Sequence, residues 1–160
     1  MSDPQTPRVF YEDIVPGEIQ RFGHAEVTRA EVIAFAARYD PQPFHLDDAA
    51  AAASPFGRLA ASGWHTCAMT MAMMVQYFHE AGLASLGGAG VDDLRWLKPV
   101  YPGDTLRAEL VVTEKRRSAS RPEMGLIRQQ VTVFNQHDEP VLRFIANGMI
   151  KVGHPQVPEA

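Results

Sequence analysis

The sequence holds a single cysteine, Cys67, among its 160 residues. One thiol cannot close a disulfide within the chain, and a metal site built on paired thiolates is excluded as well. Basic residues are also scarce, because 15 lysines and arginines stand against 19 acidic residues, for a formal net charge of -4. Such a chain has no overall positive field to attract nucleic acid or a lipid surface. We therefore expect no nucleic acid and no membrane among its partners.

Long hydrophobic runs are missing too. The most apolar stretch, Trp64 to Val75, contains polar His65 and Thr70 and is shorter than the roughly 20 apolar residues that cross a bilayer. Residues 1–8 lack the positive start and long apolar run of a secretory signal. Together with the single cysteine, these features favour a cytoplasmic protein.

The composition suits one globular domain, with 46% hydrophobic and 21% charged residues. A length of 160 residues fits the usual domain size of roughly 100–200 residues. Polar, proline-rich stretches at 1–8 and 153–160 predict disordered tails around a single domain at 9–152.

Three helices are expected in the first half. The capping box of Thr28 and Glu31 opens a short amphipathic helix over 29–39, which the prolines at 41 and 43 end. Asp47 caps a second short helix through the alanine run that follows it. Ser62 caps a long helix over 63–81 that is apolar around nearly its whole circumference, which predicts a place in the middle of the domain.

The second half reads as strands, with Val, Ile, Leu and Phe in partial two-residue alternation. The expected strands cover 91–97, 105–115, 124–135 and 141–152, with a fifth near 19–27. Short turns between consecutive strands predict an antiparallel sheet. A hydrophobic helix followed by such a sheet is an α+β arrangement, in which the sheet wraps around the helix.

Two segments could carry chemistry. Asp40 and His45 share a proline-stiffened loop, where a carboxylate and an imidazole can converge on one water molecule. Ser62 and Gly63 open the long helix, whose first N–H groups suit an oxygen that becomes negative during a reaction. Each segment also has a more common explanation, as ordinary turn residues in the first case and as a cap with close packing in the second. Together they predict proton transfer beside a carbonyl.

The same residues fall into a recognisable pattern of motifs. These are Asp40-x-x-Pro43-x-His45-Leu46-Asp47, Phe56-Gly57, Ala61-Ser62-Gly63 and Trp96-Leu97-Lys98-Pro99-Val100-Tyr101-Pro102-Gly103-Asp104. With them the sequence resembles the MaoC-like, (R)-specific enoyl-CoA hydratase family, over about Phe10 to Val152. The resemblance implies a hot dog fold, an antiparallel sheet curled around a long central helix, in a homodimer or higher homo-oligomer. It also implies reversible syn addition of water to a trans-2-enoyl-CoA, giving the (R)-3-hydroxyacyl-CoA.

The resemblance assigns residues to roles. Asp40 and His45 match the catalytic pair that holds the water, with the acid and the base left open between them, and Gly63 matches the donor to the thioester oxygen. Gln42 stands where the family usually has Asn, and Ser62 where it usually has His. Coenzyme A enters as part of the acyl-CoA substrate, and we expect no other cofactor and no metal.

Further substrate-binding candidates lie on the long helix. Trp64 follows the glycine at the mouth of the helix, and Thr70 is near the register of a small hydroxyl residue that assists in some relatives. His65 either faces the acyl pocket or is a core residue. The methionines at 69, 71, 73 and 74 form either an adaptable acyl tunnel or plain core.

The densest basic patch combines Lys115, Arg116, Arg117 and Arg121. It either meets the phosphates of coenzyme A or is a solvated hairpin end. Two other activities stay open at this point: an acyl-CoA thioesterase on the same fold and a non-catalytic acyl-CoA-binding subunit. Acyl chain length and branching are also left open.

Overall fold

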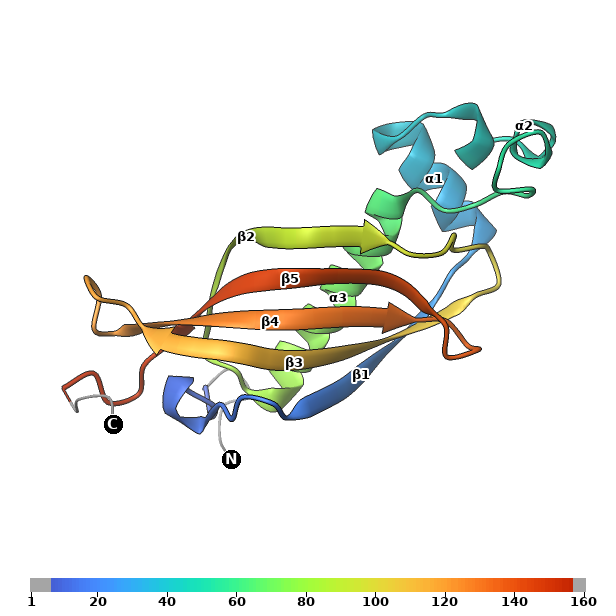
Figure 1. Cartoon of the computed structure of the whole chain (residues 1–160). Helices are drawn as coiled ribbons and strands as arrows, with labels where there is room; N and C mark the ends of the chain where they lie inside the picture. The colour runs from blue at the N-terminus through green and yellow to red at the C-terminus, as the bar shows by residue number, and fades with distance from the viewer. Residues whose placement is uncertain (1–6, 157–160) are drawn as a thin grey trace.

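A five-stranded antiparallel sheet, in the order β1-β3-β4-β5-β2, wraps one long helix in the computed structural model, which describes residues 7–156 (Figure 1). In chain order the elements are η1 (Tyr11–Asp13), β1 (Ile19–Glu26), α1 (Arg29–Tyr39), η2 (Pro43–His45), α2 (Asp48–Ala52), α3 (Gly63–Ala81), β2 (Ser85–Trp96), β3 (Thr105–Arg117), β4 (Met124–Phe134) and β5 (Pro140–Lys151). The predicted α+β architecture is confirmed.

Local signals place the helix boundaries. The Thr28 side chain accepts a hydrogen bond from the Glu31 N–H at the start of α1, and Asp40 stands at the end of that helix. Helix α3 begins after the Ser62 cap and ends at Gly82, whose φ of 70° is the left-handed conformation that glycine adopts readily. The predicted bounds of α1 and α3 are therefore confirmed.

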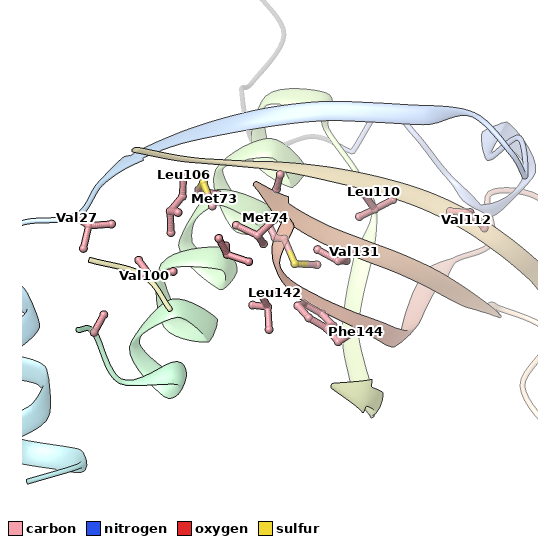
Figure 2. Close-up of a cluster of buried hydrophobic side chains, with 14 of the residues drawn as sticks. Val27, Met73, Met74, Val100, Leu106, Leu110, Val112, Val131, Leu142 and Phe144 are labelled. Atoms are coloured by element: carbon pink, nitrogen blue, oxygen red, sulfur yellow. The ribbon is translucent and has the colours of Figure 1, made fainter. Parts of the chain in front are cut away.

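The core lies between the concave face of the sheet and α3. Alternate residues of β3 and β4 are buried, as expected for strands with one face on the core. Figure 2 shows Leu106 of β3 beside Met73 of α3 and Val131 of β4 beside Met74, within one cluster of buried hydrophobic side chains. These two methionines are thus core residues.

The edge strand β2 differs from the expectation. It starts at Ser85, six residues earlier than the predicted strand at 91–97, and its pairing with β5 shifts register at three places. The extra segment includes Gly87, Gly88 and Gly90, which offer no hydrophobic alternation to read. This segment is a strand because it forms hydrogen bonds with β5. The periodicity of a sequence does not reveal pairing with a distant strand.

Helix α3 is not enclosed on all sides, contrary to the expectation from its apolar circumference. In the single chain Trp64 is 58% exposed, Met71 51% and Val75 41%. Met71 and Val75 line a cavity together with Val91 of β2, so the open side of the helix adjoins the edge of the sheet. The domain therefore presents an apolar face made by α3 and β2.

Parts of the predicted tails contact the domain. The Arg8 N–H donates to the Gly82 carbonyl at 2.8 Å, and the N–H groups of Gly153 and His154 donate to the Glu12 carboxylate. Residues 1–6 and 157–160 of the same predicted tails lie outside the described residues. Among residues 7–156, no helix is both long enough and apolar enough to cross a membrane.

A substitution at Gly125 of β4 tests how the N-terminal segment packs on the sheet, because Tyr11 of that segment lies against this glycine. A Cβ atom there would lie 2.1 Å from the Tyr11 ring, so we expect Gly125→Ala to lower the free energy of unfolding by about 1–3 kcal/mol. Urea unfolding measures it. Gly88→Ala is the matched control, because its nearest neighbour is 3.4 Å away, and equal losses in both variants would contradict the packing argument.

Candidate active site

A cavity of about 430 Å³ opens where the ends of α1 and η2 meet the start of α3 and the segment that follows β2. Asp40, His45, Gly63, Thr66 and Trp96 are among the residues that line it. In Figure 1 this region lies beyond one end of the sheet, where α1 and α2 extend past β2. The two segments that the sequence singled out therefore face one cavity.

The loop that carries Asp40 and His45 is held by its own backbone. The Asp40 N–H donates to the Ala36 carbonyl, which closes α1, and the Gln42 N–H donates to the Asp40 carbonyl at 2.7 Å. Pro43 then starts the single turn of η2, which ends at His45. Because prolines fix φ, the loop has few other conformations available to it.

Both oxygens of the Asp40 carboxylate accept hydrogen bonds. Ser62 Oγ donates to Oδ2 at 2.7 Å, and Gln42 Nε2 donates to Oδ1 at 2.7 Å. The hydrogen bond from Ser62 is the main cause that lowers the pKa of Asp40, although burial acts in the opposite direction. The hydrogen bond from Gln42 and the charge interaction with His45 lower this pKa further. Asp40 is thus a carboxylate at neutral pH.

The His45 ring is buried and fixed in orientation. Its Nδ1 lies 2.7 Å from the Ala60 carbonyl oxygen, which only accepts, so Nδ1 carries a proton. Its Nε2 lies 3.5 Å from Asp40 Oδ2, longer than a normal hydrogen bond between these atoms. The rings of Phe44 and Phe56 stand at 4.7 and 5.6 Å from the imidazole. Nε2 is therefore the nitrogen available for proton transfer.

Ser62 joins the two segments. Its hydroxyl donates to Asp40, while its oxygen accepts from the Trp64 N–H at 3.2 Å as the cap of α3. The residue is fully buried and does not line the cavity. The structure thus gives Ser62 a supporting contact with Asp40, whereas the sequence pointed to substrate binding. Gln42 does line the cavity and also donates to Asp40.

Gly63 combines two properties. A Cβ atom there would lie 2.4 Å from the Trp96 indole, so the missing side chain makes room for that indole against the start of α3. Its N–H belongs to the first helical turn and has no acceptor among residues 7–156. The close-packing explanation therefore holds, and an unpaired donor remains at the cavity.

Two tryptophans wall the cavity. The indoles of Trp64 and Trp96 meet edge to face, with ring centroids 5.2 Å apart. Trp96, like Thr66, was not selected as a site residue from the sequence. It belongs to the Trp-x-Lys-Pro stretch, which indicates the fold more than the chemistry. The signal that could have indicated Thr66 is its three-residue spacing from Gly63, which puts both residues on one side of a helix.

Other candidates lie elsewhere. Thr70 is fully buried, donates to the Thr66 carbonyl at 2.8 Å and does not line the cavity. His65 is buried and stacks on Phe35, with ring centroids 4.7 Å apart and burial lowering its pKa. His65 does not line the cavity either, so of its two interpretations the core residue is the one that agrees with the structure.

The basic patch belongs to the other end of the sheet, where β3 connects to β4 (Figure 1). Lys115 Nζ donates to the carbonyls of Tyr11 and Ile14, and Arg117 lies 3.6 Å from Glu12. These residues hold the N-terminal segment and do not line the cavity. Across residues 7–156, no three His, Cys, Asp or Glu side chains are grouped so that they could hold a metal.

The arrangement suits water chemistry beside a carbonyl. It offers an ionised carboxylate, an imidazole nitrogen and an unpaired backbone N–H around one cavity with aromatic walls. The first two can move protons, and the third can bind an oxygen that becomes negative.

Comparisons with known proteins identify the fold and the family of this chain. The chain is 40% identical to the MaoC-like dehydratase from Rhodospirillum rubrum, over 90% of this chain and 97% of that one, with a TM-score of 0.82. It is 27% identical to the (R)-hydratase from A. caviae involved in PHA biosynthesis, over 88% and 98% of the chains, with a TM-score of 0.65.

The fold itself is shared more widely. Rv0216 from Mycobacterium tuberculosis has a double hot dog fold, and this chain covers 48% of it with a TM-score of 0.73 at 19% identity. The predicted hot dog fold is thus confirmed. Residues 13–133 match the MaoC like domain, which is most of the chain, and the protein therefore belongs to the MaoC-like domain family.

Proposed function

We propose that the protein adds water reversibly across the C2=C3 bond of a trans-2-enoyl-CoA, giving the (R)-3-hydroxyacyl-CoA. The observation that carries the proposal is the hydrogen bond from Ser62 to Asp40, because it sets the acid-base pair against the open end of α3. The similarity to the (R)-hydratase from A. caviae supports a hydration that gives an (R) product. Addition of water leaves the overall oxidation state unchanged, so the proposal needs no cofactor beyond the coenzyme A of the substrate.

The geometry supports the following roles. The thioester oxygen accepts from the Gly63 N–H, and a water molecule in the cavity hydrogen-bonds to both Asp40 and His45 Nε2. Asp40 is ionised and takes a proton from the water, whose oxygen bonds to C3 while the C2=C3 electrons move toward the thioester oxygen. Protonated His45 then gives its Nε2 proton to C2. After the product leaves, a new water molecule that contacts both groups carries the proton from Asp40 to His45, whose nearest atoms lie 3.5 Å apart, and restores the site.

Removing either side chain of the pair tests this function. We expect Asp40→Asn and His45→Gln to lower kcat for hydration of crotonyl-CoA by about 10²–10⁴-fold, because general acid-base catalysis is lost. The loss of enoyl absorbance measures turnover, and chiral chromatography of the product checks the (R) configuration.

His24→Gln is the matched control, because His24 is exposed and far from the pair in sequence, beside Glu26 of β1. Unchanged hydration by Asp40→Asn would overturn the roles proposed for Asp40 and His45. Release of free coenzyme A from saturated acyl-CoA, without hydration, would make the protein a thioesterase. Binding without turnover by the wild type would make it an acyl-CoA-binding subunit.

We further propose a homodimer formed through the apolar face of α3 and β2. An edge strand presents unpaired backbone groups that a second copy can pair with. Exposed apolar side chains from both elements, among them Val75 and Val91, surround that edge. Antiparallel pairing of two β2 strands about a twofold axis would extend the sheet and cover both helices.

Charge placed on this face should separate the dimer. We expect Val75→Glu and Val91→Glu to convert the protein to monomers in sedimentation velocity experiments, because each buries a carboxylate in the proposed interface. Val15→Glu is the control, since Val15 is 54% exposed and precedes β1 at the opposite edge of the sheet. A wild type that sediments as a monomer would contradict the proposed assembly.

The pH dependence of hydration should show the effect of the Ser62 hydrogen bond on the pKa of Asp40. This hydrogen bond is the first cause of the lowered pKa of Asp40, so Ser62→Ala should raise that pKa. Because hydration needs the carboxylate, activity falls as pH drops through this pKa, and the acidic limb of kcat/KM should move to higher pH. Ser54→Ala is the control, since its hydroxyl donates to the Ala51 carbonyl. An unmoved limb would show that Asp40 is not the group titrating there.

A further inference from the structure

The hydroxyl of Thr66 is left without a partner beside the proposed catalytic groups. Thr66 is only 2% exposed and lines the cavity, yet its side chain makes no hydrogen bond within residues 7–156. Helical threonines commonly donate to the carbonyl four residues earlier, and Thr70 does so at 2.8 Å. A buried hydroxyl that forgoes this bond needs a partner from the cavity, which water supplies in the free protein and a ligand supplies when it displaces that water.

Its position relates the hydroxyl to Gly63. The two residues are three apart on α3, so they are neighbours on one side of the helix. Cα–Cβ bonds in a helix tilt toward the N-terminus, so the Thr66 side chain leans toward the turn that Gly63 opens. Protein atoms do not fully enclose the Thr66 oxygen, so the hydroxyl is accessible from the cavity.

A carbonyl oxygen can accept two hydrogen bonds, and the Gly63 N–H accounts for one. We propose that the Thr66 hydroxyl is the second donor to the thioester oxygen of the substrate. This inference rests on the proposed function. As water adds to C3, the C2=C3 electrons move onto the thioester oxygen, and they return when C2 takes its proton. Thr66 makes and breaks no covalent bond, and its hydrogen bond strengthens while the oxygen carries charge.

Replacing Thr66 by valine removes the hydroxyl and keeps the shape of the side chain. We expect Thr66→Val to lower kcat for crotonyl-CoA about 10²-fold with little change in KM, as for the loss of one donor to such an oxygen. Thr66→Ser should keep most of the activity. Thr113→Val is the control, because the Thr113 hydroxyl donates to the Arg128 carbonyl in the sheet.

A spectroscopic measurement separates this role from a structural one. Butyryl-CoA is saturated and cannot be hydrated, so the carbonyl stretch of the bound thioester can be recorded by isotope-edited infrared spectroscopy. Losing a hydrogen bond should move this stretch to higher frequency in Thr66→Val, and Thr66→Ser should restore it. If the valine variant does not fold, Thr66→Ala makes the same test with a smaller side chain.

The outcomes are distinct. This inference is overturned, and the proposed function stands, if the wild type hydrates enoyl-CoA while Thr66→Val keeps the wild-type kcat and the wild-type carbonyl frequency. A wild type that neither hydrates enoyl-CoA nor binds butyryl-CoA would overturn the proposed function, and this inference with it. A change in KM alone would place Thr66 against another part of the substrate and would also overturn the inference.

Discussion

The hydrogen bond from Ser62 to Asp40 is the contact on which the site depends. It spans 22 positions in sequence and joins the end of α1 to the beginning of α3. Through it the carboxylate stays ionised and stays beside His45, while the same serine caps the helix that offers the Gly63 N–H. One small hydroxyl therefore couples the structure of the helix start to the charge of the proposed base. A histidine at this position, as the resemblance led us to expect, would have to make that contact with a larger ring.

The sheet fixes where this contact can form. Helix α3 is held against the concave face through Met73 and Met74, and its first turn lies beside the end of β2, near α1. Trp96 then packs on Gly63 and closes one side of the cavity. The glycine thus serves twice, once for the approach of an indole and once for an unpaired N–H. A substitution there would change packing and chemistry together.

Much of the fold was readable because the signals are local. Thr28 and Ser62 cap their helices through residues two or three positions away, so the sequence carries the boundary itself. Asp40 and His45 were found in the same way, from a short loop stiffened by prolines. The first half of β2 was missed because its glycines carry no pattern and pairing with β5 decides it. The exposed side of α3 was missed because an apolar face looks the same whether it meets a core or a second molecule.

Sequence alone indicated the class of fold, the bounds of the two main helices and two residues that line the candidate site, Asp40 and His45, because caps, periodicity and turns act over a few residues. Three-dimensional packing settled how these parts are used. It brought the Ser62 hydroxyl into a hydrogen bond with Asp40. It also made Thr66, and not Thr70, part of the cavity lining. It also tied the basic residues Lys115 and Arg117 to the N-terminal segment. Such choices depend on contacts between distant segments, which no local pattern encodes.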